Sequence, residues 1–418
     1  MKKFIAFVLV LCCAGAVFAE KVEMPRFEIP TARSNGFGGS HIAYTDDVFA
    51  LLINPAAIMQ VRQKSFFTLS PTVVSPQKIL DFVNSDGGTG AILESLNNPK
   101  NPGKIPLGLS LNELPLLSFS WVANGFGFGI WDRIHADVDV VGTTAEAVVL
   151  VDVVVPIGFA FKILDTAAHD VDAGVTLKFF GRGYGEESVT ITDVLGDLAG
   201  IVEDIGAPVV AGFGMDLGFM YRWNIGLSAG ITFDDIINHG NEVYRFGGGE
   251  ENTDGYYVPF SMNLGVAYDF RIGNFWKTAP GFIARTGITA AFDWHNFDLL
   301  FAKNPYFKKN PVLGIGMGLQ FSLADLVKVR IGMSEMLPAV GFGFDLGAIE
   351  IDLAYYGKEL GLEPGQLPAA MLDVTLAIRP GAKARNWPWA RTSLVETISK
   401  LVNKPKPEET SEVTVLAE

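Results

Sequence analysis

The sequence predicts an all-β fold: a transmembrane β-barrel of about fourteen antiparallel strands, with an N-terminal hatch that plugs its lumen and with helical extracellular loops. Long segments alternate between apolar and polar residues, the candidate strands are even in number, and their connections are short and long in turn. Mean hydropathy is +0.29, with 46 Gly and 31 Phe. Beyond the first residues, however, no stretch has the ~20 uninterrupted apolar residues of a spanning helix. A hydrophobic exterior made of strands reconciles these values.

The alternation is clearest in the middle of the chain. Between residues 149 and 163 every odd position is apolar, whereas Asp152 and Lys162 occupy even positions. A soluble β-sandwich would alternate too, but these strands reach about 15 residues, whereas globular strands are typically about 5–6 residues long. Charges of both signs and many glycines on the polar side favour a barrel with lipid outside and a polar lumen inside.

The predicted wall has an even number of candidate strands, which returns the chain to the side on which it began. Short connections such as Asn124-Gly125 predict periplasmic turns, and longer ones such as 76–115 and 185–208 predict extracellular loops. Both termini are then expected in the periplasm. The candidates are residues 64–75, 116–123, 125–141, 146–164, 170–184, 209–221, 225–234, 257–271, 281–293, 312–322, 326–333, 339–346, 349–356 and 371–379.

The N-terminal residues predict export. Lys2 and Lys3 precede an apolar run that reaches Ala19, as in a cleavable signal peptide. The alternative, a membrane anchor, needs a longer run. Cys12 and Cys13 lie within it, so the rest of the chain offers no disulfide or thiolate metal site. We expect four parts: a signal peptide (1–19), a luminal hatch (20–63), a transmembrane barrel (64–380) and a periplasmic tail with a short amphipathic helix (381–418).

A short helix is expected within the hatch. Thr45 or Asp46 can cap it, its apolar residues run from Val48 to Ile53, and Asn54-Pro55 ends it. Read alone, this pattern is a helix end and a common turn dipeptide. Its position ahead of a barrel indicates a plug inside the lumen.

An acidic pair followed by Asn-Pro-Ala, in a chain with this strand count, resembles the FadL family of outer-membrane channels for long-chain fatty acids and other hydrophobic compounds. The resemblance implies a fourteen-stranded barrel in the outer membrane of a diderm bacterium, in contact with its lipid, and uptake of a hydrophobic small molecule. It covers the hatch and the barrel. Family members typically end at their last strand, whereas this chain continues beyond Pro380, which suggests a periplasmic protein partner for the tail. The matching hatch residues are Asp46, Asp47, Asn54, Pro55 and Ala56.

Candidate ligand contacts lie in the hatch and in one loop. Residues 188–206 and 76–98 have apolar residues at helical spacing, which predicts helical loops. These helices either pack on each other or, as the resemblance implies, form a hydrophobic collecting groove. Four cations on the luminal side are candidates for binding a carboxylate: Arg133, Lys178, Arg182 and Arg285. The hydrophobic candidates are Phe37, Phe49, Leu52 and Ile58 in the hatch and Leu195, Leu198 and Val202 in the loop.

Other chemistries have little support in the sequence. The five histidines have no zinc-ligand spacing, no catalytic signature stands out, and no cofactor is expected. The net charge of −14 argues against nucleic acid. Two alternatives to the hydrophobic channel remain: a general polar porin, which a hatch disfavours, and an assembly or adhesion scaffold, which the tail favours.

Overall fold

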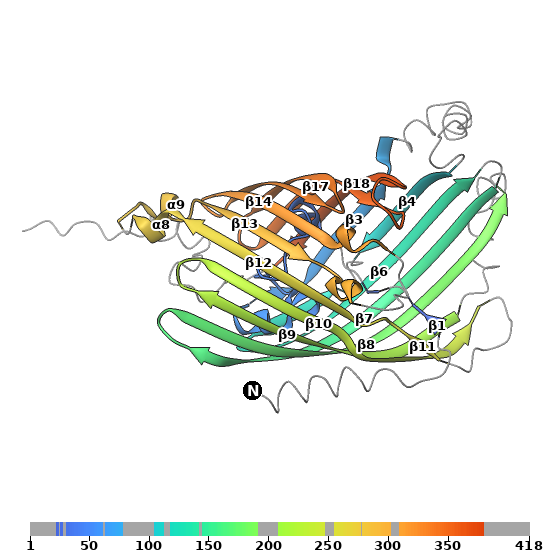
Figure 1. The fold of residues 1–418 in the computed structure, drawn as a ribbon, viewed down its shortest axis with the longest axis horizontal. Helices are drawn as coiled ribbons and strands as arrows, with labels where there is room; N and C mark the ends of the chain where they lie inside the picture. The colour runs from blue at the N-terminus through green and yellow to red at the C-terminus, as the bar shows by residue number, and fades with distance from the viewer. Residues whose placement is uncertain are drawn as a thin grey trace, which may run out of the picture.

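The described residues form one continuous antiparallel wall that curves around the N-terminal segment (Figure 1). The wall closes because β3 pairs with β18, the last strand of the sheet. The computed structural model describes residues 22–24, 26–27, 31–61, 63–77, 104–112, 118–141, 144–190, 208–246, 255–276, 278–301 and 309–379.

Fourteen places in the wall are filled by more than fourteen strand segments. β2 and β3 follow each other along one edge, and β4 and β5 both pair with β6, so each of these pairs occupies one place. β1 and β11 are two-residue segments that pair with each other. The expected antiparallel barrel of about fourteen strands is therefore confirmed. The segments are β1 (Val22–Glu23), β2 (Gln63–Ser65), β3 (Phe67–Val74), β4 (Lys104–Asn112), β5 (Phe119–Ala123), β6 (Phe126–Val141), β7 (Thr144–Asp165), β8 (His169–Thr190), β9 (Pro208–Trp223), β10 (Leu227–Arg245), β11 (Tyr256–Tyr257), β12 (Ser261–Arg271), β13 (Gly287–Trp294), β14 (Ile315–Leu323), β15 (Val327–Ser334), β16 (Leu337–Asp345), β17 (Ile349–Glu359) and β18 (Pro368–Ile378).

The strands differ from the expectation mainly at their extracellular ends. β4 lies where a loop was expected, and β10 continues to Arg245 instead of ending near Asp234. β8 includes residues 188–190, which were expected to begin a helix, because they continue the ladder with β7. The other residues of the predicted loop helices lie almost entirely outside the described part, as do the signal peptide and the tail.

Helices are short, and three of them lie in the hatch. Two more, α8 and α9, lie between β12 and β13, and α9 stands where the start of a strand was expected at residue 281. No helix among the described residues is long and apolar enough to cross a membrane. The helices are α2 (Ala32–Gly36), α3 (Ala50–Ile53), η1 (Pro55–Met59), α8 (Ile272–Phe275), α9 (Gly281–Ala284), η2 (Phe297–Leu300) and η3 (Pro311–Gly314).

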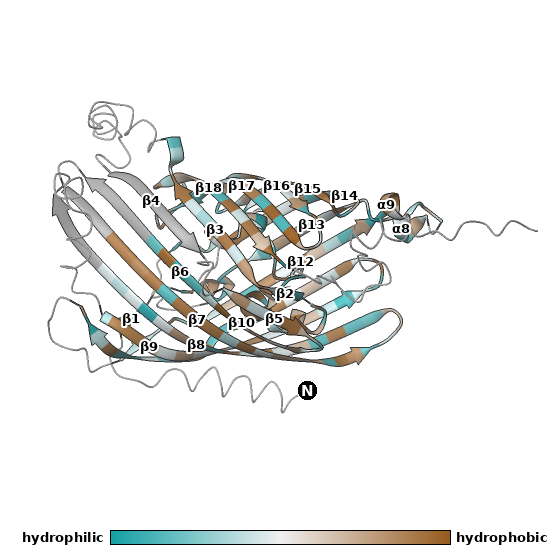
Figure 2. Ribbon diagram, turned by 180° about the vertical axis from the view of Figure 1, so that it is seen from behind, coloured by the Kyte–Doolittle hydropathy of each residue, from teal (hydrophilic) through white to brown (hydrophobic). Residues whose placement is uncertain are grey.

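The two faces of the wall have opposite character. In β14, Met317, Leu319 and Phe321 are exposed on the outside, whereas Gln320 and Ser322 are buried inside. Other strands show the same alternating hydrophobic and hydrophilic bands in Figure 2. An apolar outer surface and a polar inner surface are what a barrel needs to stand in lipid. The chain is thus built as a membrane-spanning barrel of the outer-membrane type.

The two rims of the barrel differ in their connections. At the periplasmic end five connections are turns of two or three residues, and Asn124 and Gly125 in one of them adopt positive φ. β1 pairs in parallel with β11, which lies at the opposite, extracellular end between β10 and β12. The first described residues therefore lie at the extracellular rim, although both termini were expected in the periplasm; residues 1–21 and 380–418 lie outside the described part of the chain.

One stretch of the wall has an interrupted ladder. The pairing of β6 with β7 passes from Phe128 opposite Ile157 directly to Trp131 opposite Val154. Pro156, within the gap, has no N–H to donate. On the other side of β6, the pairing passes from β5, which begins at Phe119 opposite Ile130, to β4, which ends at Asn112 opposite Arg133.

Candidate functional site

The candidate site is the contact between the hatch and the wall, and the local sequence shapes the hatch first. Thr31 caps α2 by accepting a hydrogen bond from the Ser34 N–H at 3.1 Å. Helix α3 is shorter than expected and begins after Phe49, whose N–H donates to Asp47 Oδ1 at 3.0 Å. Neither Thr45 nor Asp46 caps it.

Asn54 joins two helices of the hatch. Its backbone ends α3, and its Oδ1 caps η1 by accepting from the Ala56 N–H at 3.1 Å. Its Nδ2 donates to the Ile42 carbonyl at 3.0 Å. The Asn-Pro-Ala turn is thereby held to an earlier part of the hatch, and Pro55 at the first position of η1 needs no N–H partner.

Apolar side chains of the hatch pack directly on the wall. Phe49 lies 6.1 Å from Trp131 between ring centroids, and both are buried. Phe37 and Tyr44 form a second contact with small wall residues. The larger cluster contains Val48, Phe49, Ala50, Leu51, Ala56, Ala57, Ile58 and Val61 of the hatch with Val122, Trp131, Val154 and Met220 of the wall.

Wall glycines let the hatch backbone lie against the strands. A Cβ at Gly174 would lie 2.3 Å from the Pro55 carbonyl, and one at Gly218 would lie 2.3 Å from Asn54 Oδ1. Close approach therefore requires glycine at both positions. Eight of the hatch-contacting wall glycines form directly opposed pairs on neighbouring strands, and we call these eight the glycine seat: Gly127 with Gly158, Gly174 with Gly218, Gly230 with Gly265 and Gly318 with Gly332.

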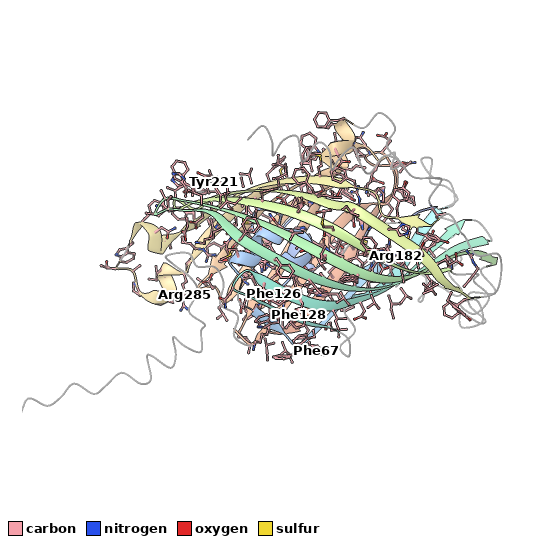
Figure 3. The ribbon with its side chains drawn as sticks, turned by 90° about the horizontal axis from the view of Figure 1, so that it is seen from below. Phe67, Phe126, Phe128, Arg182, Tyr221 and Arg285 are labelled. Carbon is pink, nitrogen blue, oxygen red and sulfur yellow. The ribbon has the colours of Figure 1, made fainter. Side chains whose placement is uncertain are left out.

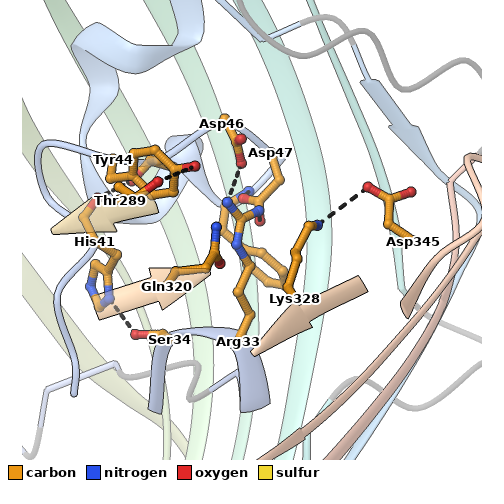
Figure 4. A network of polar contacts seen from close by, with 12 residues as sticks. Arg33, Ser34, His41, Tyr44, Asp46, Asp47, Thr289, Gln320, Lys328 and Asp345 are labelled. Carbon is orange, nitrogen blue, oxygen red and sulfur yellow. Dashed lines mark hydrogen bonds and ion pairs between the residues drawn. The ribbon is translucent and has the colours of Figure 1, made fainter. Parts of the chain in front are cut away.

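A buried charge group organises the acidic pair (Figure 4). Arg33 bridges Asp46 at 2.5 Å and Asp47 at 3.1 Å. The Arg379 guanidinium lies over the Phe49 ring at 5.3 Å, and its Nη1 donates to Glu350 Oε2 at 2.6 Å. Burial raises the pKa of Asp47, and the neighbouring Arg33 partly opposes this rise.

His41 is partly buried within the hatch. Its ring hydrogen-bonds to Ser34 Oγ and lies 5.5 Å from the His295 ring. Burial, together with His295 and Arg33, lowers the pKa of His41 to about 3, so the ring is neutral at physiological pH.

Further hydrogen bonds join the hatch to the far side of the wall. Asp293 Oδ2 accepts from the N–H groups of His41 at 2.6 Å and Ile42 at 2.8 Å. Thr375 Oγ1 accepts from the Ala32 N–H at 3.2 Å. With the helix contacts and the glycine seat, the hatch touches every wall strand from β5 round to β18.

The predicted apolar contacts divide into two groups. Phe37, Phe49 and Ile58 are buried in the hatch clusters, and Leu52 packs partly buried beside them. They form the interface between hatch and wall, so a ligand would have to compete with this packing. Leu195, Leu198 and Val202 lie outside the described residues.

Two of the predicted cations are brought to one level of the wall. Arg133 and Arg182 flank Asp152 on neighbouring strands. Arg182 binds both carboxylate oxygens of Asp152, through Nε at 2.5 Å and Nη2 at 3.0 Å.

The other two cations lie elsewhere. Lys178 bridges Asp216 at 2.8 Å and Asp235 at 2.9 Å. Arg285 follows α9 at the periplasmic end, far from Arg182 (Figure 3), and its Nε donates to the Gly281 carbonyl at 3.0 Å. The four cations do not form one binding site.

Sequence reasoning missed the residues that hold the hatch in place. Arg33 and Asp293 each serve two partners, but both look like ordinary polar residues in the sequence. The glycine seat had a usable signal, because its members recur on the luminal side of the alternating segments. Within the described part of the chain, no three His, Cys, Asp or Glu side chains are arranged to hold a metal ion.

No protein-family model and no curated protein sequence matches the chain. Solved structures do align with it. The toluene transporter TodX of Pseudomonas putida is 14% identical, with a TM-score of 0.41 and 86% of this chain and 99% of that chain covered. The toluene transporter TbuX of Ralstonia pickettii is 13% identical, with a TM-score of 0.42 and coverage of 84% and 98%. A Pseudomonas aeruginosa FadL homologue is 10% identical, with a TM-score of 0.39 and coverage of 84% and 98%.

The chain is a plugged outer-membrane-type barrel. This conclusion follows from the wall itself, which has an apolar exterior and surrounds the hatch. The protein thus has the architecture that the resemblance to the FadL family implies. Sequence identities and TM-scores as low as these do not show which ligand this protein binds or what its individual residues do.

Proposed function

We propose that this protein is an outer-membrane channel for hydrophobic compounds. The observation that carries the proposal is that the hatch contacts the wall around almost its whole circumference. A fourteen-stranded barrel without a plug is wide enough for water and ions, since slightly larger barrels already leave an aqueous channel. A filled lumen supports a gated channel over a general polar porin.

The apolar cluster of the hatch lies beside the interrupted stretch of β6. Trp131 belongs to that cluster and also flanks the gap in the ladder with β7. A weakened wall next to an apolar interior gives a nonpolar molecule a route toward lipid that avoids water. We therefore propose lateral exit near Trp131, with burial worth ~0.8 kcal/mol per methylene as the driving force.

A long-chain fatty acid is the finer part of the proposal. Its carboxylate would need a cation, yet Lys178 and Arg182 already hold acidic partners on the wall. A fatty acid would have to exchange with Asp152 or with Asp216, whereas a neutral hydrocarbon would not. Uptake of a neutral apolar probe, measured against that of its carboxylated analogue, separates these ligand classes.

Removal of the hatch tests the proposal directly. In planar bilayers the intact protein should show little ionic conductance, and deletion of residues 24–59 should raise it strongly because the lumen then fills with water. Cells that contain the intact protein should take up an apolar fluorescent probe faster than cells that lack it.

Two outcomes would contradict the proposal. Large, stable conductance of the intact protein would mean that the lumen is open and that the polar porin is the better description. Low conductance without any uptake of apolar probes would favour the scaffold instead. Gly181→Ala, on the lipid side of β8 with no atom within 4 Å of the added Cβ, is the folded control for both assays.

A further inference from the structure

One periplasmic connection differs from all the others. The other five are turns of two or three residues, whereas β12 and β13 are joined by residues 272–286, which form the helical hairpin α8–α9. In Figure 1 this hairpin projects from the end of the barrel. A connection at this place needs only a turn, so the extra residues call for another explanation.

The two helices of the hairpin pack against each other, and the hairpin is joined to the wall by defined contacts. Gly273 lets the two helices touch, because a Cβ there would lie 2.9 Å from the Ala284 carbonyl. Its base is fixed to the barrel by Arg271, which donates to the Arg285 carbonyl at 3.0 Å and bridges Asp325 at 2.5 Å. The hairpin therefore holds a defined position relative to the wall.

Large aromatic side chains cover its outside. Phe275 is 68% exposed, Trp276 51% and Phe282 58%, although aromatic side chains of this size are usually buried. The Trp276 indole N–H donates to Thr278 Oγ1 at 2.9 Å, so its polar atom has a local partner. Such side chains at a rim need a nonpolar or interfacial environment.

The hairpin continues the lipid-facing surface of the barrel. The Phe275 ring stacks on Phe270 with centroids 4.8 Å apart and an interplanar angle of 24°. Phe270 ends the exposed apolar row of β12, which also contains Leu264, Val266 and Tyr268. The aromatic surface of the hairpin thus starts where the wall leaves the hydrocarbon.

Charge favours the same neighbour. Residues 272–286 contain no Asp or Glu and include Lys277, in a chain whose net charge is −14. A segment with basic and aromatic residues but no acidic ones suits a layer of phospholipid headgroups.

We propose that the α8–α9 hairpin is an interfacial anchor that lies in the headgroup layer of the periplasmic leaflet. Phe275, Trp276 and Phe282 enter the boundary between headgroups and acyl chains. Through Arg271 and Arg285 the anchor then sets the depth of β12 and β13 in the membrane. This inference does not depend on the proposed channel function.

Fluorescence quenching in proteoliposomes tests the anchor. Cys12 and Cys13, the only cysteines, are replaced by serine, and an environment-sensitive fluorophore is attached to Thr278→Cys at the hairpin tip. Ala167→Cys, exposed in the β7–β8 turn at the same rim, is the matched control. Phosphatidylcholine with a nitroxide near its headgroup should quench the Thr278 label several-fold more than the Ala167 label, and aqueous iodide should show the reverse order.

The aromatic residues should be responsible for this difference. Combined Phe275→Ser, Trp276→Ser and Phe282→Ser substitutions should reduce lipid quenching at Thr278 to the level at Ala167. Heat-modifiable migration on gels should show that the barrel still forms, and Phe282→Ser alone serves if the triple variant does not fold. Equal lipid quenching of both labels, or quenching that persists after the substitutions, would overturn the anchor. Iodide access equal at both labels would show that the hairpin stands in water and would likewise overturn the anchor.

Discussion

At the residue scale, the hatch backbone approaches the wall closely at glycines, which have no side chain to keep it away. Where the Asn-Pro turn meets β8 and β9, Gly174 and Gly218 leave room for the Pro55 backbone and the Asn54 side chain. Both hydrogen bonds of the Asn54 side chain lie within the hatch, to Ile42 and Ala56. The wall shapes this turn by contact, and the turn holds itself together by hydrogen bonds.

Gly174→Ala should therefore destabilise the protein by ~1–3 kcal/mol, because the added Cβ forces Pro55 away from β8. Gly181→Ala on the same strand should change stability by less than about 0.5 kcal/mol, since it has open space. Urea titration followed by tryptophan fluorescence measures both. Equal effects of the two substitutions would mean that the hatch does not press on β8.

The neutral state of His41 predicts a dependence of stability on pH. Its pKa in the folded protein is about 3, whereas an unfolded chain would protonate it near 6.5. Between these values the unfolded state binds more protons, so His41 lowers folded stability as the pH falls below 6.5, by up to about 1.4 kcal/mol per pH unit. The raised pKa of Asp47 acts in the opposite direction, since its folded carboxyl takes up a proton first.

His41→Gln removes only the histidine contribution. Stability of this variant should fall less steeply between pH 6.5 and 4 than that of the parent chain, by urea titration at a series of pH values. Identical slopes in the two proteins would show that His41 is not held neutral.

At the scale of the element, each strand has an apolar face and a polar face, because apolar and polar residues alternate along it. The pattern predicted β14 and β17 well, since short turns bound both strands at their periplasmic ends. It missed β4, although Ile105, Leu107, Leu109 and Leu111 alternate with polar or small residues there, because Pro106 and Gly108 indicate a loop as readily as a strand. It also placed a strand start at residue 281, because Gly281–Ala284 reads equally well as a strand or as part of a hairpin.

The depth of a lipid-facing residue in the membrane can be tested on one strand. Leu319 lies in the middle of β14 and Leu323 at its periplasmic end, four residues apart on the same exposed face. Leu319→Arg should cost ~2–4 kcal/mol near the midplane, and Leu323→Arg only ~0–1 kcal/mol near the interface. Unfolding in lipid vesicles gives both values. If the two substitutions cost the same, β14 does not cross the bilayer with this face toward lipid.

At the scale of the whole molecule, the hatch fills the lumen of the barrel and adds its own ion pairs to those of the wall. Many luminal charges are paired within the wall, as in Arg182 with Asp152 and Arg222 with Asp172. The hatch adds its own ion pairs through Arg33 and fills the space between opposite sides of the wall. Removing one partner of a buried ion pair typically lowers the free energy of unfolding by about 3–5 kcal/mol. Single substitutions at these luminal charges should therefore be strongly destabilising.

The sequence by itself determined the strands, their two faces and the presence of a plug, because alternation, turn residues and the Asn-Pro break are local properties of the chain. Only the tertiary structure decided what the plug touches. Asn54 meets Gly218, 164 positions away, and His41 meets Asp293, 252 positions away, because closing the barrel fixes the stagger of every strand at once. That stagger depends on the sum of all the registers around the wall, so no single segment encodes it.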